Sequence, residues 1–456
     1  MSGRRRCLAV PLLLIAGSFA AADDLAFDAG AEPIDLPTAL RLVNQSSPAV
    51  AVARARLAEA VAREDRARLQ WLPSLTAGIT YNRFDGLTQN QRGDVFSVSR
   101  ANIFFSGGPG LRLDTADAVF DRLIARRLTA AERAGSQQTA LDAQLDAALA
   151  FVELTQAYAL LAENAVTLAE AEKLLARALR ARAADLTRPP GTAVRAEAEV
   201  SARRQERFEL EGRAGVAMAQ LARACMLPPA TPLRPANPAP VPLPLVDLTA
   251  PADELVAVAI ANRPDLAANR SLVAAAWERV RKAKAAPLLP RAVVEQQTGG
   301  YGAGKNDILG PFAGRSALTA GFVWELRNLG FGTAAFTREE RARWEQTVHR
   351  LADAQQRAAA EVVSAARSAT ARGKSLTVAR QTVDDAAEWY RRTVVAGTKA
   401  LDAGQTYDAQ EELRALQAWH QARGLAVAAV SEFNRAEFRL YTALGSPPDA
   451  AVAPPP

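Results

Sequence analysis

The residue types that could do chemistry do not form a catalytic or metal-binding pattern in this sequence. His349 and His420 each lie in a long helical stretch with no second histidine or cysteine nearby, whereas zinc sites gather several such ligands at short spacing. We expect both histidines on solvated helix faces. Cys225 has no neighbouring histidine to activate it, and we interpret it as a small packing residue. The sequence therefore predicts no catalytic residue, metal or cofactor, and no enzyme.

A glycine-rich stretch, Gly299-Gly-Tyr-Gly-Ala-Gly304, comes closest to a phosphate-binding loop. Such loops continue into Lys-Ser/Thr and open a helix. This stretch lacks that ending and lies between two expected strands, so we interpret it as a loop between them. Without a nucleotide site, any transport through this chain would draw its energy from a partner.

Residues 1–22 have the pattern of a secretory signal peptide. Three arginines, Arg4–Arg6, precede an apolar stretch from Leu8 to Phe19, and small residues lead to a cleavage point before Asp23. The apolar part is too short to span a bilayer as a stable helix. Downstream we find no apolar run of about 18 residues, so the sequence predicts no transmembrane helix.

The mature chain offers neither a basic face nor a disulfide. The formal net charge of +6 includes the arginines of the signal peptide, and nucleic-acid binding needs a concentrated basic face. We therefore expect no nucleic-acid partner. Cleavage removes Cys7 and leaves Cys225 alone, so no intramolecular disulfide can form.

The mature sequence contains two copies of one unit. Residues 40–73 and 255–290 share a leucine-containing start, a proline, an Ala/Arg/Glu helix and an end in Leu-Pro. Each copy continues with two β-like segments, a very long helix, a turn and a return helix, and such internal repetition indicates a duplicated structural unit. We assign residues 23–227 to the first repeat and residues 253–445 to the second.

Proline-rich segments separate and follow the two repeats. Residues 228–252 are dense in proline, which forbids a helix and favours an extended connector. Residues 446–456 end in three prolines, and we expect a disordered tail.

Side chains alternate in the segments expected to be strands. Leu75, Ala77, Ile79 and Tyr81 are apolar and their neighbours are small or polar, which is typical of a strand with one apolar face. Such strands could cross a bilayer or cover a soluble core, and alternation alone leaves both open. In lipid, four strands with open edges would need further chains to close a barrel. The predicted strand pairs are residues 74–84 with 95–105 and residues 291–298 with 316–326.

Heptad periodicity runs through the two longest helical stretches, residues 115–186 and 333–396. In the first, leucines recur every seven residues from Leu154 to Leu175, the period of a coiled coil. About 65 helical residues reach roughly 100 Å, more than an ordinary globular domain needs. The predicted return helices are residues 194–226 and 407–444, and the shorter helices that complete the columns are residues 49–70 and 265–286.

Short motifs recur at the junctions between these elements. In the second repeat they are Asn262-Arg-Pro-Asp-Leu266, Leu288-Leu-Pro290 and Trp324-Glu-Leu-Arg-Asn-Leu-Gly330-Phe-Gly332. Elsewhere they are Phe104-Phe-Ser-Gly-Gly108, Val194-Arg-Ala-Glu-Ala198, Leu227-Pro-Pro229, Phe433-Asn-Arg-Ala436 and Ala443-Leu-Gly445. This ordered set covers nearly the whole mature chain and closely resembles the TolC family of outer-membrane efflux proteins.

The resemblance implies a fold that is mainly α with a β-barrel portion. Duplicated β-hairpins and long coiled-coil helices would form a trimeric twelve-stranded barrel, four strands per protomer, continued by an α-helical tunnel. Such a homotrimer would lie in the outer membrane of a Gram-negative-type envelope, in contact with lipid, with its helices in the periplasm. The implied partners are a periplasmic adaptor (membrane fusion) protein and an inner-membrane pump.

By the same resemblance, the turns at the ends of the long helices bind the adaptor. Proline and glycine there end the helices and let the chain reverse, and either of two glycines could mark the second turn. The residues assigned to the two turns are Arg188, Pro189, Pro190, Gly191, Gly397 and Gly404.

Acidic residues beside the second turn are candidates for a gate. In the family, carboxylates there ring a closed periplasmic entrance, and the nearest candidates are Asp402, Asp408, Glu411 and Glu412. A ring of like charges would attract cations and respond to protonation. The alternative is a solvated first helical turn favoured by the helix dipole. The family's paired aspartates do not occur at the expected spacing.

The sequence thus predicts the passive exit duct of a tripartite efflux pump or a type I secretion system. The alternative is a structural or adhesive trimeric coiled-coil protein that spans the envelope, which would not need matched strand pairs in both repeats. The chain does not reveal whether the cargo is a drug, a metal ion or a polypeptide.

Overall fold

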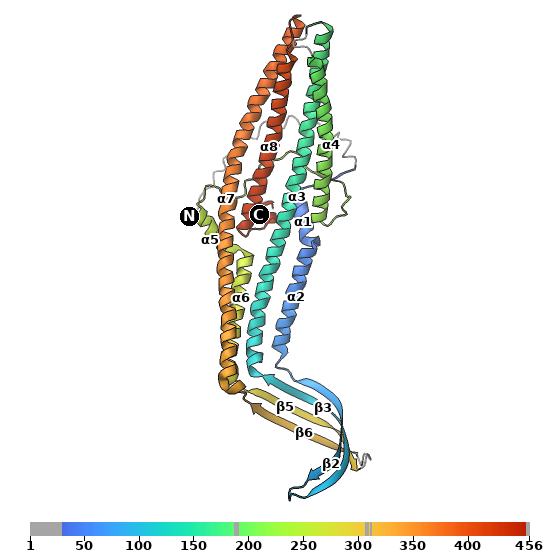
Figure 1. Ribbon diagram of the computed structural model, residues 1–456, viewed down its shortest axis with the longest axis vertical. Helices are drawn as coiled ribbons and strands as arrows, with labels where there is room; N and C mark the ends of the chain where they lie inside the picture. Colours follow the sequence, from blue (N-terminus) through green and yellow to red (C-terminus); the bar gives the residue numbers. More distant parts are fainter. Residues whose placement is uncertain (1–29, 187–190, 306–309, 311, 453–456) are drawn as a thin grey trace. The chain divides into compact units, whose positions relative to one another are not determined.

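The computed structural model describes residues 30–186, 191–305, 310 and 312–452. The predicted signal peptide and the tip residues Arg188, Pro189 and Pro190 lie outside the described residues. The chain divides into two compact units, which we call the helical unit and the sheet unit (Figure 1). The helical unit holds the described parts of residues 1–52, 137–264 and 355–456, and the sheet unit holds residues 53–136 and the described parts of 265–354.

The two repeats contain the same order of elements. In the first, β1 (Glu32–Ile34) precedes α1 (Leu36–Ser46), α2 (Pro48–Leu69), β2 (Ser74–Gln89), β3 (Val95–Asp114), α3 (Thr115–Ala183) and α4 (Thr192–Ala224). After β4 (Leu233–Pro235) in the connector, the second has α5 (Ala252–Asn262), α6 (Pro264–Ala285), β5 (Arg291–Lys305), β6 (Phe312–Val323), α7 (Phe331–Asp402) and α8 (Ala409–Ala443). A short helix, α9 (Pro448–Val452), follows.

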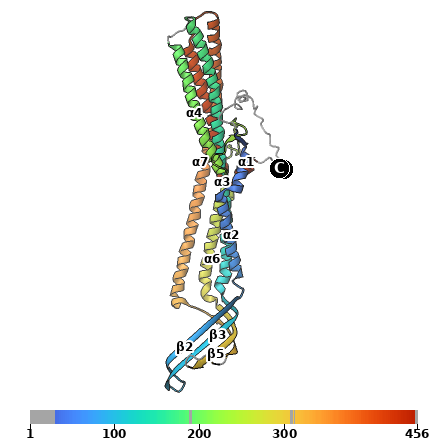
Figure 2. The same cartoon turned by 90° about the vertical axis from the view of Figure 1, so that its right-hand side faces the viewer.

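The sheet unit contains one antiparallel sheet with the strand order β2-β3-β5-β6. Figure 2 labels β2, β3 and β5 of this sheet. The register places Ile79 opposite Phe105, Phe105 opposite Gly300 and Ala292 opposite Phe322. Each repeat therefore supplies one strand pair, and the pairs join along β3 and β5. In the described chain, β2 and β6 each keep one edge without a strand partner.

The glycine-rich stretch is part of a strand, so its assignment to a loop was wrong. β5 runs through Gly299–Gly304 to Lys305. A Cβ at Gly299 would lie 1.7 Å from the carbonyl oxygen of Phe105 on β3, so this position excludes any larger residue. Glycine here marks a close approach of two backbones, not a turn.

The core of the helical unit lies between α3, α4, α7 and α8. Near one end of this unit, Ala171 and Ala178 of α3 pack with Ala196 of α4, Tyr390 of α7 and Leu416 of α8. Small alanines let the helices approach closely, and the heptad leucines Leu154 and Leu161 are buried in a second cluster with α1 and α4. The helices thus bury the apolar heptad positions that are visible in the sequence.

The connector is attached to α8 and does not run free. The backbone N–H groups of Leu245 and Val246 donate to the Glu437 carboxylate at 2.9 and 3.0 Å, and that of Leu243 donates to Asn434 at 2.8 Å. Burial raises the pKa of the Glu437 carboxyl, although these backbone donors oppose the shift. β4 also pairs in parallel with β1.

The tail predicted to be disordered contains α9 in its described part. The Asp449 carboxylate accepts hydrogen bonds from the side-chain amides of Asn44 and Gln144, each at 3.1 Å. These partners lie hundreds of positions away in the sequence, so no local pattern indicates them. The prediction of disorder was wrong for residues 448–452.

One helix is more apolar than the prediction of no transmembrane helix implies. α3 contains an 18-residue window of mean hydropathy 1.4, long and apolar enough by composition to cross a membrane. Half of that window is buried within the structure, as in the core helix of a packed bundle. We therefore interpret α3 as a packed helix.

Candidate functional site

The sheet has one apolar face. Along β2 and β6, alternate side chains are large, apolar and exposed, with 85% exposure for Leu75, 71% for Leu318 and 68% for Phe322. The register carries this face across β3 and β5 through Phe105 and Val294. A contiguous apolar surface of this kind is unfavourable in water and indicates contact with lipid or another protein.

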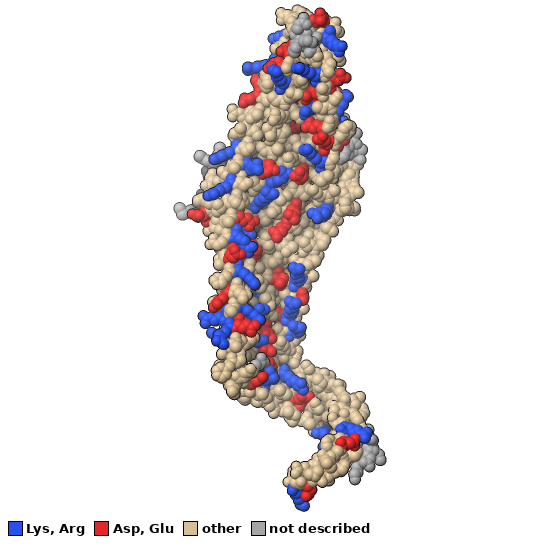
Figure 3. All heavy atoms as spheres, viewed as in Figure 1, with Lys and Arg blue, Asp and Glu red and all other residues tan. Residues whose placement is uncertain are grey.

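The opposite face of the same sheet, which we call the polar face, carries polar side chains together with the aromatic Phe84, Phe96 and Phe104. Asn82 of β2 donates to Asn102 of β3 at 3.1 Å, and Arg112 of β3 pairs with Glu295 of β5 at 3.1 Å. Thr76 and Thr319 lie on this side by alternation. A sheet with one apolar and one polar face fits a barrel wall between lipid and water. Figure 3 shows charged side chains dense over the helices and sparse over the strands.

Aromatic and apolar side chains are exposed where the strands meet the helices. Trp71 follows α2, Trp324 follows β6, and Phe331 begins α7, with exposures of 49%, 61% and 79%. Between Trp324 and Phe331 the chain turns through Asn328 and Leu329, which both have positive φ. Tryptophan, whose ring is amphipathic, concentrates at membrane–water interfaces.

Both long helices end in the same type of turn. The N–H of Leu186 donates to Ala181 O at 2.9 Å after α3, and that of Gln405 donates to Ala400 O at 2.8 Å after α7. The residues before these donors, Asp185 and Gly404, have φ of 56° and 67°. These are Schellman motifs, with a left-handed residue just past the helix end.

The second turn is marked by Gly404 and not by Gly397. Gly397 lies inside α7, so its assignment to the turn was wrong. A Cβ there would lie 2.8 Å from the ring of Tyr407, which explains why this helical position is a glycine. Gly191 precedes α4 with φ 86°, and it remains a turn residue.

A buried polar cluster lies beside the two turns. The N–H of Tyr407 donates to Leu186 O at 3.0 Å and links the two turns. The Tyr407 hydroxyl donates to the Glu412 carboxylate, which also pairs with Arg177 of α3. Burial and the Glu412 charge raise the pKa of the Tyr407 hydroxyl. The cluster therefore fixes α8 against α3 at this end of the helical unit.

The four acidic gate candidates differ in their surroundings. Asp402 and Asp408 are exposed and Glu411 is half-buried, whereas Glu412 is fully buried and neutralised by Arg177. Asp408 caps α8 by accepting from the N–H of Gln410 at 2.9 Å. Glu412 therefore does not present its charge to a passage, and Asp408 has the capping role expected of a first-turn acid.

The sequence alone did not reveal that His420 is buried and hydrogen-bonded. Predicted on a solvated face, it is largely buried between α3 and α4. Its Nδ1 lies 3.1 Å from the Thr167 hydroxyl, and its Nε2 lies 3.2 Å from the Glu206 carboxylate. Burial and Arg203 lower the pKa of His420, against the opposing charge of Glu206.

Sequence comparisons and structural comparisons give different results. No family model and no curated protein matches the chain. Among solved structures, the outer-membrane channel OprN shares 18% identity with a TM-score of 0.70, over 92% of this chain and 96% of its own. A membrane protein from Pseudomonas aeruginosa shares 17% identity with a TM-score of 0.73, over 93% and 95% of the two chains. The outer membrane protein VceC from Vibrio cholerae shares 19% identity with a TM-score of 0.69, over 90% and 96%.

This chain has the outer-membrane channel fold. The prediction of a mainly α fold with two strand pairs and duplicated long helices, which the resemblance to the TolC family also implies, is confirmed. The number of chains that close the barrel stays a prediction. Within the outer-membrane channel fold, the two-faced sheet and the paired helical turns are the candidate functional regions.

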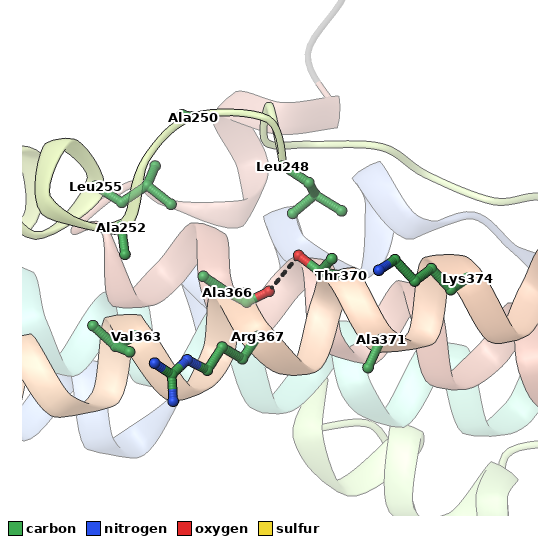
Figure 4. Close-up of a pocket in the computed structure, with 10 residues that line it drawn as sticks. All are labelled: Leu248, Ala250, Ala252, Leu255, Val363, Ala366, Arg367, Thr370, Ala371 and Lys374. Atoms are coloured by element: carbon green, nitrogen blue, oxygen red, sulfur yellow. Dashed lines mark hydrogen bonds between the residues drawn. The ribbon is translucent and has the colours of Figure 1, made fainter.

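A pocket of about 350 Å³ lies outside these two regions, between the proline-rich connector, α5 and α7. Its floor and walls are aliphatic, from Leu248, Leu255 and Val363, while Arg367 and Lys374 of α7 lie along one side (Figure 4). The hydrogen bond drawn there joins the Thr370 hydroxyl to Ala366 O within α7. The lining holds no carboxylate, histidine or cysteine. Across the described residues no three His, Cys, Asp or Glu side chains are grouped to hold a metal ion.

Proposed function

We propose that this chain is one protomer of a passive outer-membrane exit duct that serves a tripartite efflux pump or a type I secretion system. The observation that carries the proposal is the four-stranded sheet, with one exposed apolar face, one polar face and two edges that have no strand partner in the described chain. The structural neighbour OprN is an outer-membrane channel, which supports the same assignment.

The sheet edges supply the reason for assembly. In lipid an unpaired backbone N–H or C=O has no water to bond, so a sheet must close on itself. Four strands leave no conducting lumen, whereas three copies give twelve strands and remove every edge. The apolar face would then meet outer-membrane lipid, and the polar face would line the passage.

The helical turns are the proposed docking surface for a periplasmic adaptor and, through it, an inner-membrane pump. Residues Arg188, Pro189, Pro190, Gly191 and Gly404 remain in this proposal, while Gly397 leaves it because it lies within α7. Asp402, Asp408 and Glu411 remain gate candidates, and Glu412 leaves because Arg177 neutralises it. The energy for transport would come from the pump.

Conductance of the purified protein tests the proposal. Native mass spectrometry of the detergent-extracted chain should give three copies per particle, and the particle should form stable channels in planar lipid bilayers. A structural or adhesive coiled-coil protein would bind to the lipid bilayer but would form no ion-conducting channels. A folded trimer that never forms channels contradicts the duct.

A further inference from the structure

Charges are unevenly distributed along the polar face of the sheet. At the end near the helices, each arginine has an acidic partner: Arg112 pairs with Glu295 at 3.1 Å, and Arg291 pairs with Asp114 at 3.5 Å. We call the remainder, from Gly299 on β5 toward the β2–β3 turn, the outer half of the polar face. It contains Arg100 and Arg315, both exposed, and its described residues include no carboxylate.

Aromatic rings hold these two arginines in place. The Arg315 guanidinium lies 5.5 Å from the ring centre of Phe104 and 5.1 Å from that of Tyr301. The Arg100 guanidinium lies 5.4 Å from the ring centre of Phe84. Phe104 and Tyr301 also pack edge to face, with their ring centres 6.2 Å apart. This contact restricts the motion of the two rings beside Arg315.

Stacking fixes the cation without consuming its hydrogen-bond donors. A guanidinium that lies over a ring keeps its N–H groups at the edge of the plane, where they can bind a carboxylate, phosphate or sulfonate. No acidic side chain among the described residues competes for Arg100 or Arg315. Among the described residues, both positions therefore offer a positive charge held near an aromatic ring.

Resting on the proposed duct, we propose that Arg100 and Arg315 make the outer half of the barrel an anion-selecting lining and that the duct favours anionic cargo. Three copies would turn each arginine into a ring of three positive charges in a low-dielectric wall. Rings of arginine or lysine are how pores select anions, and a lining of one sign raises the local concentration of the opposite ion.

The acids at the helical turns could oppose this preference, so the two sets of charges must be separated by mutation. Asp402, Asp408 and Glu411 would draw cations if they ringed the entrance, whereas Glu412 is paired with Arg177. The arginine rings keep their charge, because guanidinium groups are not deprotonated in proteins. Measurement at about pH 8, where carboxylates are ionised, therefore gives the acids their full influence.

The test is the reversal potential of single channels in planar lipid bilayers under a KCl gradient at that pH. Wild-type protein should pass chloride in preference to potassium. The R100Q/R315Q double variant should lower the chloride-to-potassium permeability ratio about threefold or more, and inorganic pyrophosphate should block its current less than that of wild type. The charge-conserving R100K/R315K variant should keep the preference. The control is R83Q, the same change on the apolar face. It should leave the chloride-to-potassium permeability ratio unaltered.

The outcomes separate this inference from the duct itself. Potassium-preferring wild-type channels, or R100Q/R315Q channels with unchanged selectivity, overturn the inference and leave the duct intact. If D402A/D408A/E411A shifts the ratio and R100Q/R315Q does not, selectivity lies at the turns and the inference fails. Absence of channels from folded wild-type trimers overturns the duct, and the inference with it. Trimer recovery and circular dichroism establish that each variant has folded.

Discussion

Arg177 of α3 and Glu412 of α8 form a buried ion pair beside the two turns that end the long helices. The side chains are 11% and 1% exposed, and the Tyr407 hydroxyl donates a further hydrogen bond to Glu412. With these two partners, the Glu412 carboxylate links α8 to α3. It is therefore unsuited to present charge to a passage.

Removing one partner of this pair should destabilise the helical unit strongly. In Glu412→Ala the Arg177 guanidinium remains buried without its counter-ion, and such losses cost about 3–5 kcal/mol of unfolding free energy. Replacement of both partners by apolar residues, R177M/E412L, should cost far less, because no charge is left uncompensated. Chemical denaturation of the detergent-solubilised protein, followed by circular dichroism, measures both. Equal losses in the two variants would contradict this account.

Replacing Gly397 by alanine should lower the stability of the fold, whereas the same replacement at an ordinary helical glycine raises it. Gly→Ala in an exposed helix interior usually stabilises by about 0.5–1 kcal/mol, and Gly212 of α4, where an added Cβ would meet no atom within 4 Å, should follow this rule. At Gly397 the new Cβ would lie 2.8 Å from the Tyr407 ring and force that ring away from Glu412. Gly397→Ala should therefore lower the thermal midpoint while Gly212→Ala keeps or raises it. A stabilised Gly397→Ala protein would show that Tyr407 can move freely.

These two positions show how far the sequence predicts the structure. Periodicity located both strand pairs and all the long helices, because alternation and heptads record which faces are buried. It did not separate Gly397 from Gly404, since glycine serves equally at a turn or a close contact. It also left Glu412 among solvated acids, because its partner Arg177 lies in the other repeat.

The same limitation applies to the sheet and to the tail. The sequence predicts a loop at Gly299 because the neighbouring strand β3 is distant in sequence. That an added Cβ would lie 1.7 Å from the Phe105 carbonyl oxygen depends on tertiary structure. Asp449 in the tail orders α9 through Asn44 and Gln144, which lie in the first repeat. Local patterns record solvent exposure and backbone preference, whereas these contacts depend on how the two repeats come together.

His420 should make stability sensitive to mild acid. Its surroundings comprise Thr167 of α3, Glu199, Arg203 and Glu206 of α4, and its own helix α8. Burial lowers the pKa in the folded state, so the folded state binds fewer protons than the unfolded state. The neutral imidazole then contributes stability that is complete above the unfolded pKa of about 6.5 and is lost as pH falls below it.

The difference between wild type and His420→Gln isolates this effect from the other titrating groups. Between about pH 7.5 and pH 5.5, the thermal midpoint of wild type should fall more than that of His420→Gln. Glutamine can still contact Glu206 but does not titrate. Parallel pH profiles for the two proteins would mean that His420 keeps the same pKa on unfolding.

Cys225 should be unreactive until the helical unit opens. The side chain is 1% exposed within a cluster that contains Leu40 and Leu221. Burial raises the pKa of its thiol to about 11, so almost no thiolate exists at neutral pH. A maleimide should label the native protein slowly and the denatured protein at once, and labelling should track unfolding monitored by circular dichroism. Rapid modification of native protein would place Cys225 at an accessible surface.

The two faces of β2 should respond oppositely to a new charge. Ile79 lies on the apolar face and is 68% exposed, while its neighbour Thr80 lies on the polar face beside Phe104. A lysine on the lipid side near the bilayer midplane costs about 2–4 kcal/mol, and a lumen-facing lysine costs much less. Ile79→Lys should therefore lower the yield of folded trimer in lipid vesicles and its urea midpoint, while Thr80→Lys should assemble normally and alter only conductance. If Thr80→Lys proved the more damaging change, the assignment of apolar and polar faces to lipid and passage would have to be reversed.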